Sequence, residues 1–488
     1  MGERTRGRGQ PQPARPQGSA DILVTPVRWT LRGEAEAIAP NRPPLRIWGG
    51  IPGEQERVKV VHRGEHSVAG RIVEPTAPSP YRRDPQCEKY APCGGCPLMH
   101  VTPDGQEVAH RSLVTDALAE SGIQAPIGMY HGSPDGDYRH VVKLGVGRSD
   151  MQRLRVGAWG RGDRRIVPIP NCTVAAPVLR KTMAQVAHWI LEMDIWPWDP
   201  VTKQGTLRAV VLRASRTSNE VMVTLVVGRN TPKLVELAEQ ISQSVAEVVG
   251  IWMHLNEDPG NNIYTRDDQG VIGILPLRGR DWIEEKLNGV TYRIGPGDFF
   301  QTNPAVAEVL FQRVVERLDP TPDDVVIDLY CGVGGITLQA AGKAGFVLGI
   351  EEIDGAIARA KESTRINRSN AEFQVGQVVE VLPELAKRFA GTRPLVSVNP
   401  ARRGLEDGVV EAIAELAPAR VVYVSCNPKA LARDIAAFQA LGFRLEGDLE
   451  LFDMFPNTAH VEVVATLLGP ASEEPKRRAP RRRALRGA

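Results

Sequence analysis

Residues 325–335 decide the fold of this chain and read Val-Val-Ile-Asp-Leu-Tyr-Cys-Gly-Val-Gly-Gly, an apolar run that ends in a glycine-rich turn. A helical pattern begins near residue 336, and glycines between a strand and a helix let the backbone approach a bound nucleotide. The stretch 346–354, FVLGIEEID, then places Glu351 and Glu352 about 20 residues after the turn, where an acid contacts ribose hydroxyls. Taken alone, the turn is equally compatible with a tight turn that binds nothing.

The segments after this turn alternate between strands and helices. Apolar runs at 346–353, 395–400 and 421–426 are separated by helical patterns near 356–367 and 408–416. Strands that alternate with helices predict a parallel, doubly wound α/β sheet. The last run, HVEVVATLL, has the pattern of an antiparallel strand. We therefore predict a Rossmann-like domain over residues 276–470.

The glycine-rich turn differs from that of dinucleotide-binding enzymes, because it lacks the pattern GxGxxG. Its pattern, DxYxGxGG followed by a later acid, resembles the class I S-adenosylmethionine methyltransferases, whose ligand has no pyrophosphate. The resemblance implies S-adenosylmethionine as the cofactor.

The first half of the chain lacks this regular alternation of strands and helices. Residues 21–78 contain short β-type runs separated by Gly and Pro, which predict a small barrel. Residues 79–275 follow as a central β-rich α+β domain that opens with a cysteine-bearing loop and a helix near 107–120. Residues 1–20 and 471–488 are basic tails that we expect to be disordered.

The composition excludes several classes of protein. The chain has 488 residues with 60 Lys and Arg against 58 Asp and Glu, so any surface for nucleic acid must be local. No stretch approaches the roughly 20 apolar residues of a membrane span. The N-terminus lacks the apolar segment of a secretion signal, which predicts a cytoplasmic protein in a reducing compartment. No feature predicts an obligate protein partner.

Four of the six cysteines predict a metal centre. Cys87, Cys93 and Cys96 lie in the loop CEKYAPCGGC, and Cys172 ends the segment PIPNC. Four thiolates can hold zinc or an iron-sulfur cluster, and the spacing alone does not separate the two. Pro97, directly after the third cysteine, favours iron, because ferredoxin-type loops share this feature.

Two residues near the C-terminus predict covalent catalysis. Cys426 ends an apolar strand and precedes an Asn-Pro turn, at the edge of the sheet where open α/β folds bind ligands. Glu462 lies within the apolar run HVEVVATLL, and buried acids are rare unless they are paired or functional. A thiol near such a glutamate forms a nucleophile and base pair. The alternatives are a core cysteine and a glutamate that faces water.

With these residues in place, the sequence resembles the RNA 5-methyluridine methyltransferases. Within this family, the sequence resembles the branch that carries an N-terminal TRAM domain and an iron-sulfur cluster and acts on 23S ribosomal RNA. The resemblance extends from about residue 21 to residue 468, through landmarks in the order GEAEAIA, GGIPGEQERVKV, CEKYAPCGGCPLMH, DFFQTNP, DLYCGVGG, NPARRG, SCNP and DMFPNTAHVE.

The resemblance implies a role for each matching residue. By this resemblance, residues 21–78 would form an OB-like TRAM barrel that binds RNA. Cys426 would be the nucleophile and Glu462 the general base. The ligands of a [4Fe-4S] cluster become Cys87, Cys93, Cys96 and Cys172. The positions that bind S-adenosylmethionine become Gln301, Tyr330, Gly335, Glu351, Gln377 and Asn399.

Some of these positions depart from the family pattern. Asn399 replaces an Asp, Ala401 a Pro, Gln377 an acid and Gly335 a frequent Asn. An amide forms hydrogen bonds but supplies no negative charge. One alternative is therefore an RNA-binding or RNA-remodelling protein with an impaired transferase site. Further alternatives are a transfer-RNA uracil-5-methyltransferase and an amino-group methyltransferase, although the latter chemistry needs no covalent cysteine.

Overall fold

The computed structural model describes residues 21–40, 42–65, 67–149, 151–162, 165–260, 262–266 and 272–470. The chain divides into two compact units, Met1–Arg82 and Arg83–Ala488. Both basic tails predicted from the sequence lie outside the described residues. Among the described helices, none combines the length and the apolar character that crossing a membrane requires.

The first unit contains a six-stranded sheet in the order β1-β5-β6-β4-β3-β2. Pro26, a residue without a backbone N–H donor, lies between β1 and β2. The sheet covers a small core of Ala35, Leu45, Ile47 and Val58. The strands are β1 Ile22–Val24, β2 Arg28–Trp29, β3 Ala35–Ala37, β4 Leu45–Trp48, β5 Gln55–Arg63 and β6 Val68–Ala77.

The second unit contains a seven-stranded sheet in the order β10-β9-β8-β11-β12-β13-β14. Helices α2 Pro177–Glu192 and α3 Lys233–Ser244 pack their apolar sides against it. The strands are β8 Val141–Arg148, β9 Leu154–Trp159, β10 Ile166–Val167, β11 Leu207–Ala214, β12 Val221–Val227, β13 Val248–Leu255 and β14 Ile274–Gly279.

The large sheet of the second unit follows the order β19-β18-β17-β20-β21-β24-β23-β7, with β22 paired to β24. The strands from β19 to β21 run parallel, and β24 is antiparallel to both neighbours. This confirms the predicted doubly wound α/β fold. The strands are β7 Ile127–His131, β17 Val325–Leu329, β18 Phe346–Glu351, β19 Glu372–Val375, β20 Leu395–Val398, β21 Arg420–Ser425, β22 Arg444–Leu445, β23 Leu449–Phe452 and β24 Glu462–Leu468.

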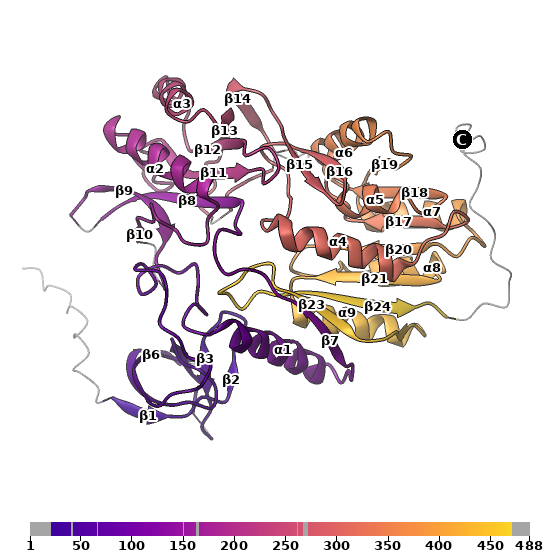
Figure 1. Cartoon of the computed structure of the whole chain (residues 1–488), viewed down its shortest axis with the longest axis horizontal. Coiled ribbons are helices and arrows are strands. Elements are labelled where there is room, and N and C mark those ends of the chain that lie inside the picture. Colours follow the sequence, from indigo (N-terminus) through magenta and orange to yellow (C-terminus); the bar gives the residue numbers. More distant parts are fainter. Residues whose placement is uncertain are drawn as a thin grey trace, which may run out of the picture. The chain divides into compact units, whose positions relative to one another are not determined.

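Helices cover both faces of this sheet (Figure 1). One face packs against α4, α5, α6 and the hairpin of β15 Ile283–Leu287 and β16 Val290–Ile294, and the other against α1, α7, α8 and α9. The helices are α1 Pro103–Glu120, α4 Pro304–Leu318, α5 Gly335–Ala340, α6 Asp354–Ile366, α7 Val378–Arg388, α8 Val409–Glu415 and α9 Pro428–Ala440.

Two elements from the stretch 79–275 join this large sheet, although the sequence places that stretch in a separate central domain. Strand β7 pairs in parallel with β23, and α1 packs against α9. Strand β14 crosses residue 275 and pairs with β13. The seven-stranded sheet and the large sheet of the second unit are therefore interleaved along the chain, and the segment before β8 helps to build the edge of the large sheet.

Candidate active site and cysteine pocket

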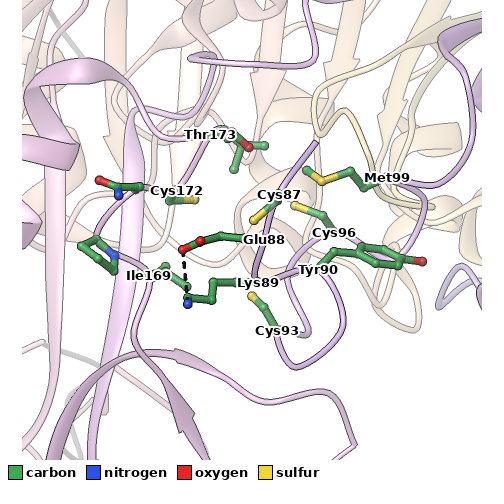
Figure 2. Close-up of a pocket in the computed structure, with 13 residues that line it drawn as sticks. Cys87, Glu88, Lys89, Tyr90, Cys93, Cys96, Met99, Ile169, Cys172 and Thr173 are labelled. Carbon is green, nitrogen blue, oxygen red and sulfur yellow. Dashed lines mark ion pairs between the residues drawn. The ribbon is translucent and has the colours of Figure 1, made fainter. Parts of the chain in front are cut away.

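The four cysteines of the expected metal centre line one pocket, with an empty volume of about 450 Å³ including its open side. Figure 2 shows Cys87, Cys93 and Cys96 on one loop and Cys172 on a separate segment. The backbone N–H of Gly95 donates to the sulfur of Cys93 at 3.4 Å. Folding thus brings Cys172 to the same pocket as the cysteines of the loop.

Two of the thiols in this pocket, those of Cys93 and Cys96, are poorly solvated. Burial raises the pKa of Cys96 to about 12, and the neighbouring thiols oppose its ionisation further, while Arg139 favours it. Burial likewise raises the pKa of Cys93. Across the described residues, no three His, Cys, Asp or Glu side chains are grouped to hold a metal ion. The donor set is soft and suits iron-sulfur chemistry.

A second cavity lies beside the glycine-rich turn, with an empty volume of about 440 Å³ including its open side. It extends from the end of β17 to the segment that precedes α4. Four of the six residues expected to bind S-adenosylmethionine line it, namely Gln301, Tyr330, Gly335 and Asn399.

The turn itself has the backbone that a ligand cradle requires. Gly332 and Gly334 have φ angles of +54° and +87°, in the left-handed region that favours glycine. A Cβ at Gly335 would lie 2.7 Å from the ring of Phe311, so the close packing of α5 against α4 explains why no asparagine occupies this position. Tyr330, with φ of +62°, donates its hydroxyl to Glu406 at 2.7 Å.

The two remaining cofactor residues do not line the cavity. The carboxylate of Glu351 accepts the backbone N–H groups of Gly332 and Ile353, both at 3.1 Å, and therefore shapes the turn. Each oxygen keeps a further lone pair for a ribose hydroxyl. Burial raises the pKa of Glu351. Gln377 is the residue before α7, where its backbone carbonyl accepts from Glu380 and Val381.

Cys426 directly follows β21, and Glu462 begins the adjacent strand β24, at the side of the large sheet where the parallel strands end. Ser425 pairs with Val463 in the antiparallel register of β21 and β24, so the next residues outward are Cys426 and Glu462. Asn427 then caps α9 by accepting the N–H of Lys429 at 3.2 Å. The strand register therefore places the predicted thiol and carboxylate opposite each other.

Burial dominates the electrostatics of this pair. Glu462 is only 5% exposed, and burial raises its pKa to about 7, against the opposing charge of Arg402. Burial raises the pKa of Cys426 to about 11, and the negative charge of Glu462 adds to the shift while Arg402 opposes it. A carboxylate with this pKa is poised to accept a proton near neutral pH.

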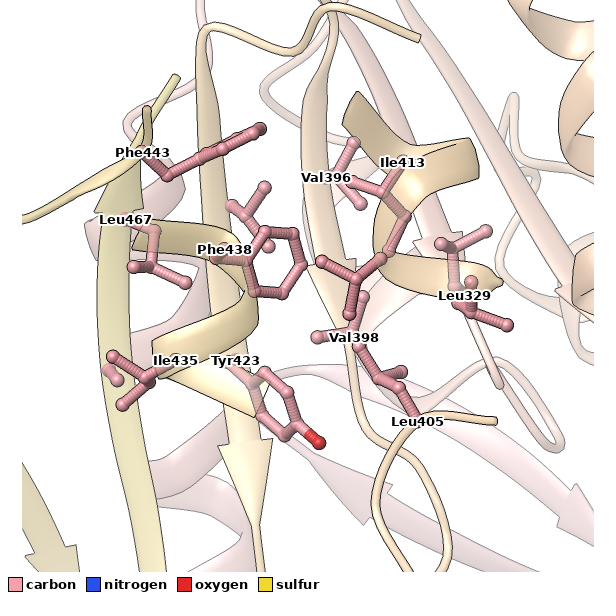
Figure 3. Packing of buried hydrophobic residues seen from close by; sticks show 14 of the residues in the cluster. Leu329, Val396, Val398, Leu405, Ile413, Tyr423, Ile435, Phe438, Phe443 and Leu467 are labelled. Atoms are coloured by element: carbon pink, nitrogen blue, oxygen red, sulfur yellow. The ribbon is translucent and has the colours of Figure 1, made fainter. Parts of the chain in front are cut away.

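Arg402 was not among the predicted site residues, although its loop was. Its carbonyl accepts the side-chain amide of Asn427 at 2.8 Å, which ties the loop to the start of α9. Asp434 accepts the N–H of Leu405 at 2.9 Å and the hydroxyl of Tyr423 at 2.6 Å. Figure 3 shows Leu405 and Tyr423 within the buried core beneath this loop. Arg402 lies directly after Ala401 in the motif NPARRG, and this position was the sequence signal for it.

Comparisons with known proteins agree with this geometry. A sequence model of the tRNA (Uracil-5-)-methyltransferase family matches residues 384–468. An uncharacterized RNA methyltransferase of Clostridium tetani is 30% identical over 425 residues, which cover 86% of this chain and 90% of that protein. Another from Geobacter sulfurreducens is 33% identical over 438 residues, which cover 87% and 85% respectively.

A solved structure extends the likeness to the fold. The crystal structure of Pyrococcus abyssi tRNA (uracil-54, C5)-methyltransferase in complex with S-adenosyl-L-homocysteine aligns with a TM-score of 0.69 at 26% identity. The alignment covers 91% of this chain and 99% of that chain.

The doubly wound sheet, the glycine-rich turn and the adjoining cavity define a class I S-adenosylmethionine-dependent methyltransferase. Together with the sequence relatives, they show that the chain belongs to the RNA uracil-5-methyltransferase family. RNA is its substrate and S-adenosylmethionine its methyl donor.

Proposed function

We propose that this enzyme methylates carbon 5 of a uracil in RNA through a covalent adduct between Cys426 and the base. The observation that carries the proposal is the register of β21 and β24, which sets Cys426 opposite Glu462. Uracil carbon 5 is a poor nucleophile, so a thiol that activates it and a base that completes the reaction are both needed.

Cys426 performs the first step. Its thiolate adds to carbon 6 of uracil, and the electrons of the 5,6 double bond move to form an enolate. Carbon 5 of this enolate can then accept a methyl group. Arg402 favours the thiolate, because its positive charge lowers the pKa of Cys426 against the effect of burial.

Glu462 performs the last step. Its carboxylate removes the proton from carbon 5, the 5,6 double bond forms again, and the bond from sulfur to carbon 6 breaks to release the Cys426 thiolate. The buried carboxylate has a pKa of about 7, so a useful fraction is ionised at neutral pH while its basicity exceeds that of an exposed glutamate.

S-adenosylmethionine supplies an electrophilic methyl group and leaves as S-adenosylhomocysteine. Gln301, Tyr330 and Asn399 line the cavity that would hold it, and Glu351 supports the glycine-rich turn beside that cavity. Because Cys426 must reach carbon 6 of the target, the nucleotide has to leave its stack, which favours a loop or another unpaired segment of RNA.

We propose 23S ribosomal RNA as the substrate, on the resemblance of the barrel and cysteine-loop motifs. Transfer RNA is the second candidate, because the matching family model and the Pyrococcus abyssi structure both bear transfer-RNA names. Unmodified transcripts of each RNA, incubated with the enzyme and labelled S-adenosylmethionine, separate the two. Mass spectrometry should locate 5-methyluridine in the ribosomal transcript, and Cys426→Ala should abolish it. RNA binding without methylation of either transcript would favour the impaired-transferase alternative.

We also propose that Cys87, Cys93, Cys96 and Cys172 hold a [4Fe-4S] cluster, and that residues 21–78 form an RNA-binding barrel of TRAM type. The shared pocket and the soft thiol donors support the cluster. Protein purified without oxygen should be brown and contain iron and acid-labile sulfide. Stoichiometric zinc without iron would contradict the cluster. Removal of residues 21–78 should weaken RNA binding.

A further inference from the structure

The loop that precedes Glu462 is held by one buried asparagine. This loop spans residues 453–461, between β23 and β24, and Asn457 lies within it at only 1% exposure. Its φ of +67° is in the left-handed region, where asparagine is tolerated better than most other residues. The loop therefore makes a tight reversal five residues before the base.

The side chain of Asn457 is occupied on both of its polar atoms. Its Oδ1 accepts from Nη2 of Arg83 at 2.8 Å and from Nε2 of Gln106 at 3.3 Å. Its Nδ2 donates to the carbonyl of Asp135 at 3.0 Å. An asparagine whose amide is satisfied in this way has one orientation, and buried networks of this kind rigidify their surroundings.

The backbone of Asn457 is fixed as well. Its N–H donates to Oε1 of Gln106 at 2.7 Å, and its carbonyl accepts the N–H of Leu98 at 2.9 Å. The neighbouring carbonyls of the loop are also held, because Pro456 accepts the Tyr138 hydroxyl at 3.0 Å and Thr458 accepts from Nε2 of His110 at 2.8 Å.

These contacts connect the 453–461 loop to the segment that carries three of the cysteines in the pocket. Leu98 lies two residues after Cys96, and Arg83 also donates from Nε to the carbonyl of Met99 at 3.1 Å. Tyr138 packs with Met99 in the small core that includes Cys87 and Cys96. The segment that carries the metal-type cysteines and the loop that precedes the base therefore share one hydrogen-bonded unit.

We propose that Asn457 is a positioning residue that ties the cysteine loop to the 453–461 loop and so holds the Glu462 carboxylate opposite Cys426. The inference rests on the proposed function, because it assigns Asn457 to the base-catalysed release step. Cys426 directly follows β21, which is also held by its parallel pairing with β20, on the side away from β24. Loosening the loop should consequently slow release while leaving thiol addition and methyl transfer intact.

The test replaces Asn457 with glycine, which accepts the positive φ and keeps both backbone hydrogen bonds but removes the side-chain amide. Asn288→Gly is the matched control, because Asn288 also has a positive φ of 49° and a side chain bonded to a carbonyl, that of Glu308, at 2.7 Å. Asn288 lies in the exposed turn between β15 and β16, outside the site.

Two RNA probes separate the steps. A 23S transcript with ordinary uridine reports complete turnover. A transcript with 5-fluorouridine reports addition and methyl transfer alone, because carbon 5 then carries fluorine, which a base cannot remove as a proton. A base misplaced by about 1 Å can cost on the order of a hundredfold in rate.

We expect Asn457→Gly to lower turnover on ordinary RNA by about ten- to a hundredfold and to accumulate an adduct that requires S-adenosylmethionine and Cys426. Trapping of the fluorinated transcript should remain within about threefold of wild type, as should both activities of Asn288→Gly. Equal losses on the two probes, or wild-type turnover, would overturn the inference. A wild-type enzyme that neither methylates nor traps these transcripts, nor the matching transfer-RNA transcripts, would instead refute the proposed function.

If Asn457→Gly does not fold, Arg83→Gln tests the same link, since it removes the guanidinium contacts to Asn457 and Met99. The same selective loss of release is expected. Iron content measured on each variant shows whether the cysteine pocket is intact. Selective loss of release with full iron content supports the positioning role, whereas loss of iron with unchanged release contradicts it.

Discussion

Replacing Glu462 with glutamine tests the mechanism most directly. Glutamine keeps the size of the side chain at the start of β24 but cannot accept the carbon-5 proton. Thiol addition and methyl transfer should proceed, because Cys426 and the cofactor cavity are unchanged. The product should then remain attached to the enzyme, since its release requires loss of that proton.

The expected slowing of product release follows from the loss of the general base. General base catalysis contributes about 10²- to 10⁴-fold, so release should slow by roughly this factor. With a pKa of about 7 for Glu462, about a tenth of the wild-type carboxylate is ionised at pH 6 and about nine tenths at pH 8. Wild-type release should therefore rise about ninefold over this range, and the glutamine variant should lose this dependence.

The same pKa predicts the sign of the effect on stability. Burial raises the pKa of Glu462 from 4.5 to about 7, so the folded state favours the protonated form. Ionisation thus destabilises the fold increasingly as the pH rises from 4.5 through 7. Glutamine avoids this cost and should raise the free energy of unfolding at pH 8 by up to about 3 kcal/mol.

Denaturing electrophoresis of enzyme with labelled RNA is the assay, and single-turnover measurements from pH 6 to 8 give the rate of release. Glu450→Gln is the matched control, because Glu450 is a buried carboxylate on the adjacent strand β23 that binds Arg313 and Arg317 instead of facing the site. It should accumulate no adduct. Folded Glu462→Gln enzyme with wild-type turnover would refute the assignment, as would an adduct that persists without Cys426.

Further predictions concern single groups. Arg402→Gln should raise the pKa of Cys426, slowing adduct formation at pH 7 by about tenfold, measured as a shift in the pH dependence of iodoacetamide alkylation. The pKa of Glu450 is lowered to about 2 by Arg313, His131 and Arg317, so its stabilisation is present above pH 4.5 and is lost as the pH falls toward 2. Acid unfolding of Glu450→Gln should show a smaller loss over that interval, and an unchanged profile would contradict the ion-pair role. Cys172→Ser should lose iron and sulfide together, measured on protein purified without oxygen, whereas full retention would exclude Cys172 as a ligand. Removing residues 476–488, which contain seven Lys and Arg residues, should reduce the slope of log affinity against log salt by up to about 5.

The sequence predicted the large sheet well because its signals are local. Apolar runs separated by helical patterns are readable within a few residues, and α6 and α8 begin and end within two residues of the expected positions. Strand β7 was not predictable in the same way. Its pairing of Ile127 with Leu449 joins segments more than 300 residues apart, and no local pattern encodes such a partner.

The site was predictable only in part for a similar reason. Cys426 and Glu462 each stand at a strand end, so their proximity follows once the two strands pair. Asn457 sits in a loop whose partners, Arg83 and Gln106, come from the far end of the chain. The composition of this loop looks like that of any turn. Only the folded chain shows that Asn457 is buried and that both polar atoms of its side chain form hydrogen bonds.

The presence of Asn399 where the family has an Asp is the basis for the alternative of an impaired transferase. Asn399 follows β20 and lines the cavity with Gln301 and Tyr330, whereas the covalent chemistry depends on Cys426 and Glu462. An amide there still donates and accepts hydrogen bonds to a ligand. The exchange of Asp for Asn therefore bears on ligand recognition in the cavity and leaves the pair of Cys426 and Glu462 in place.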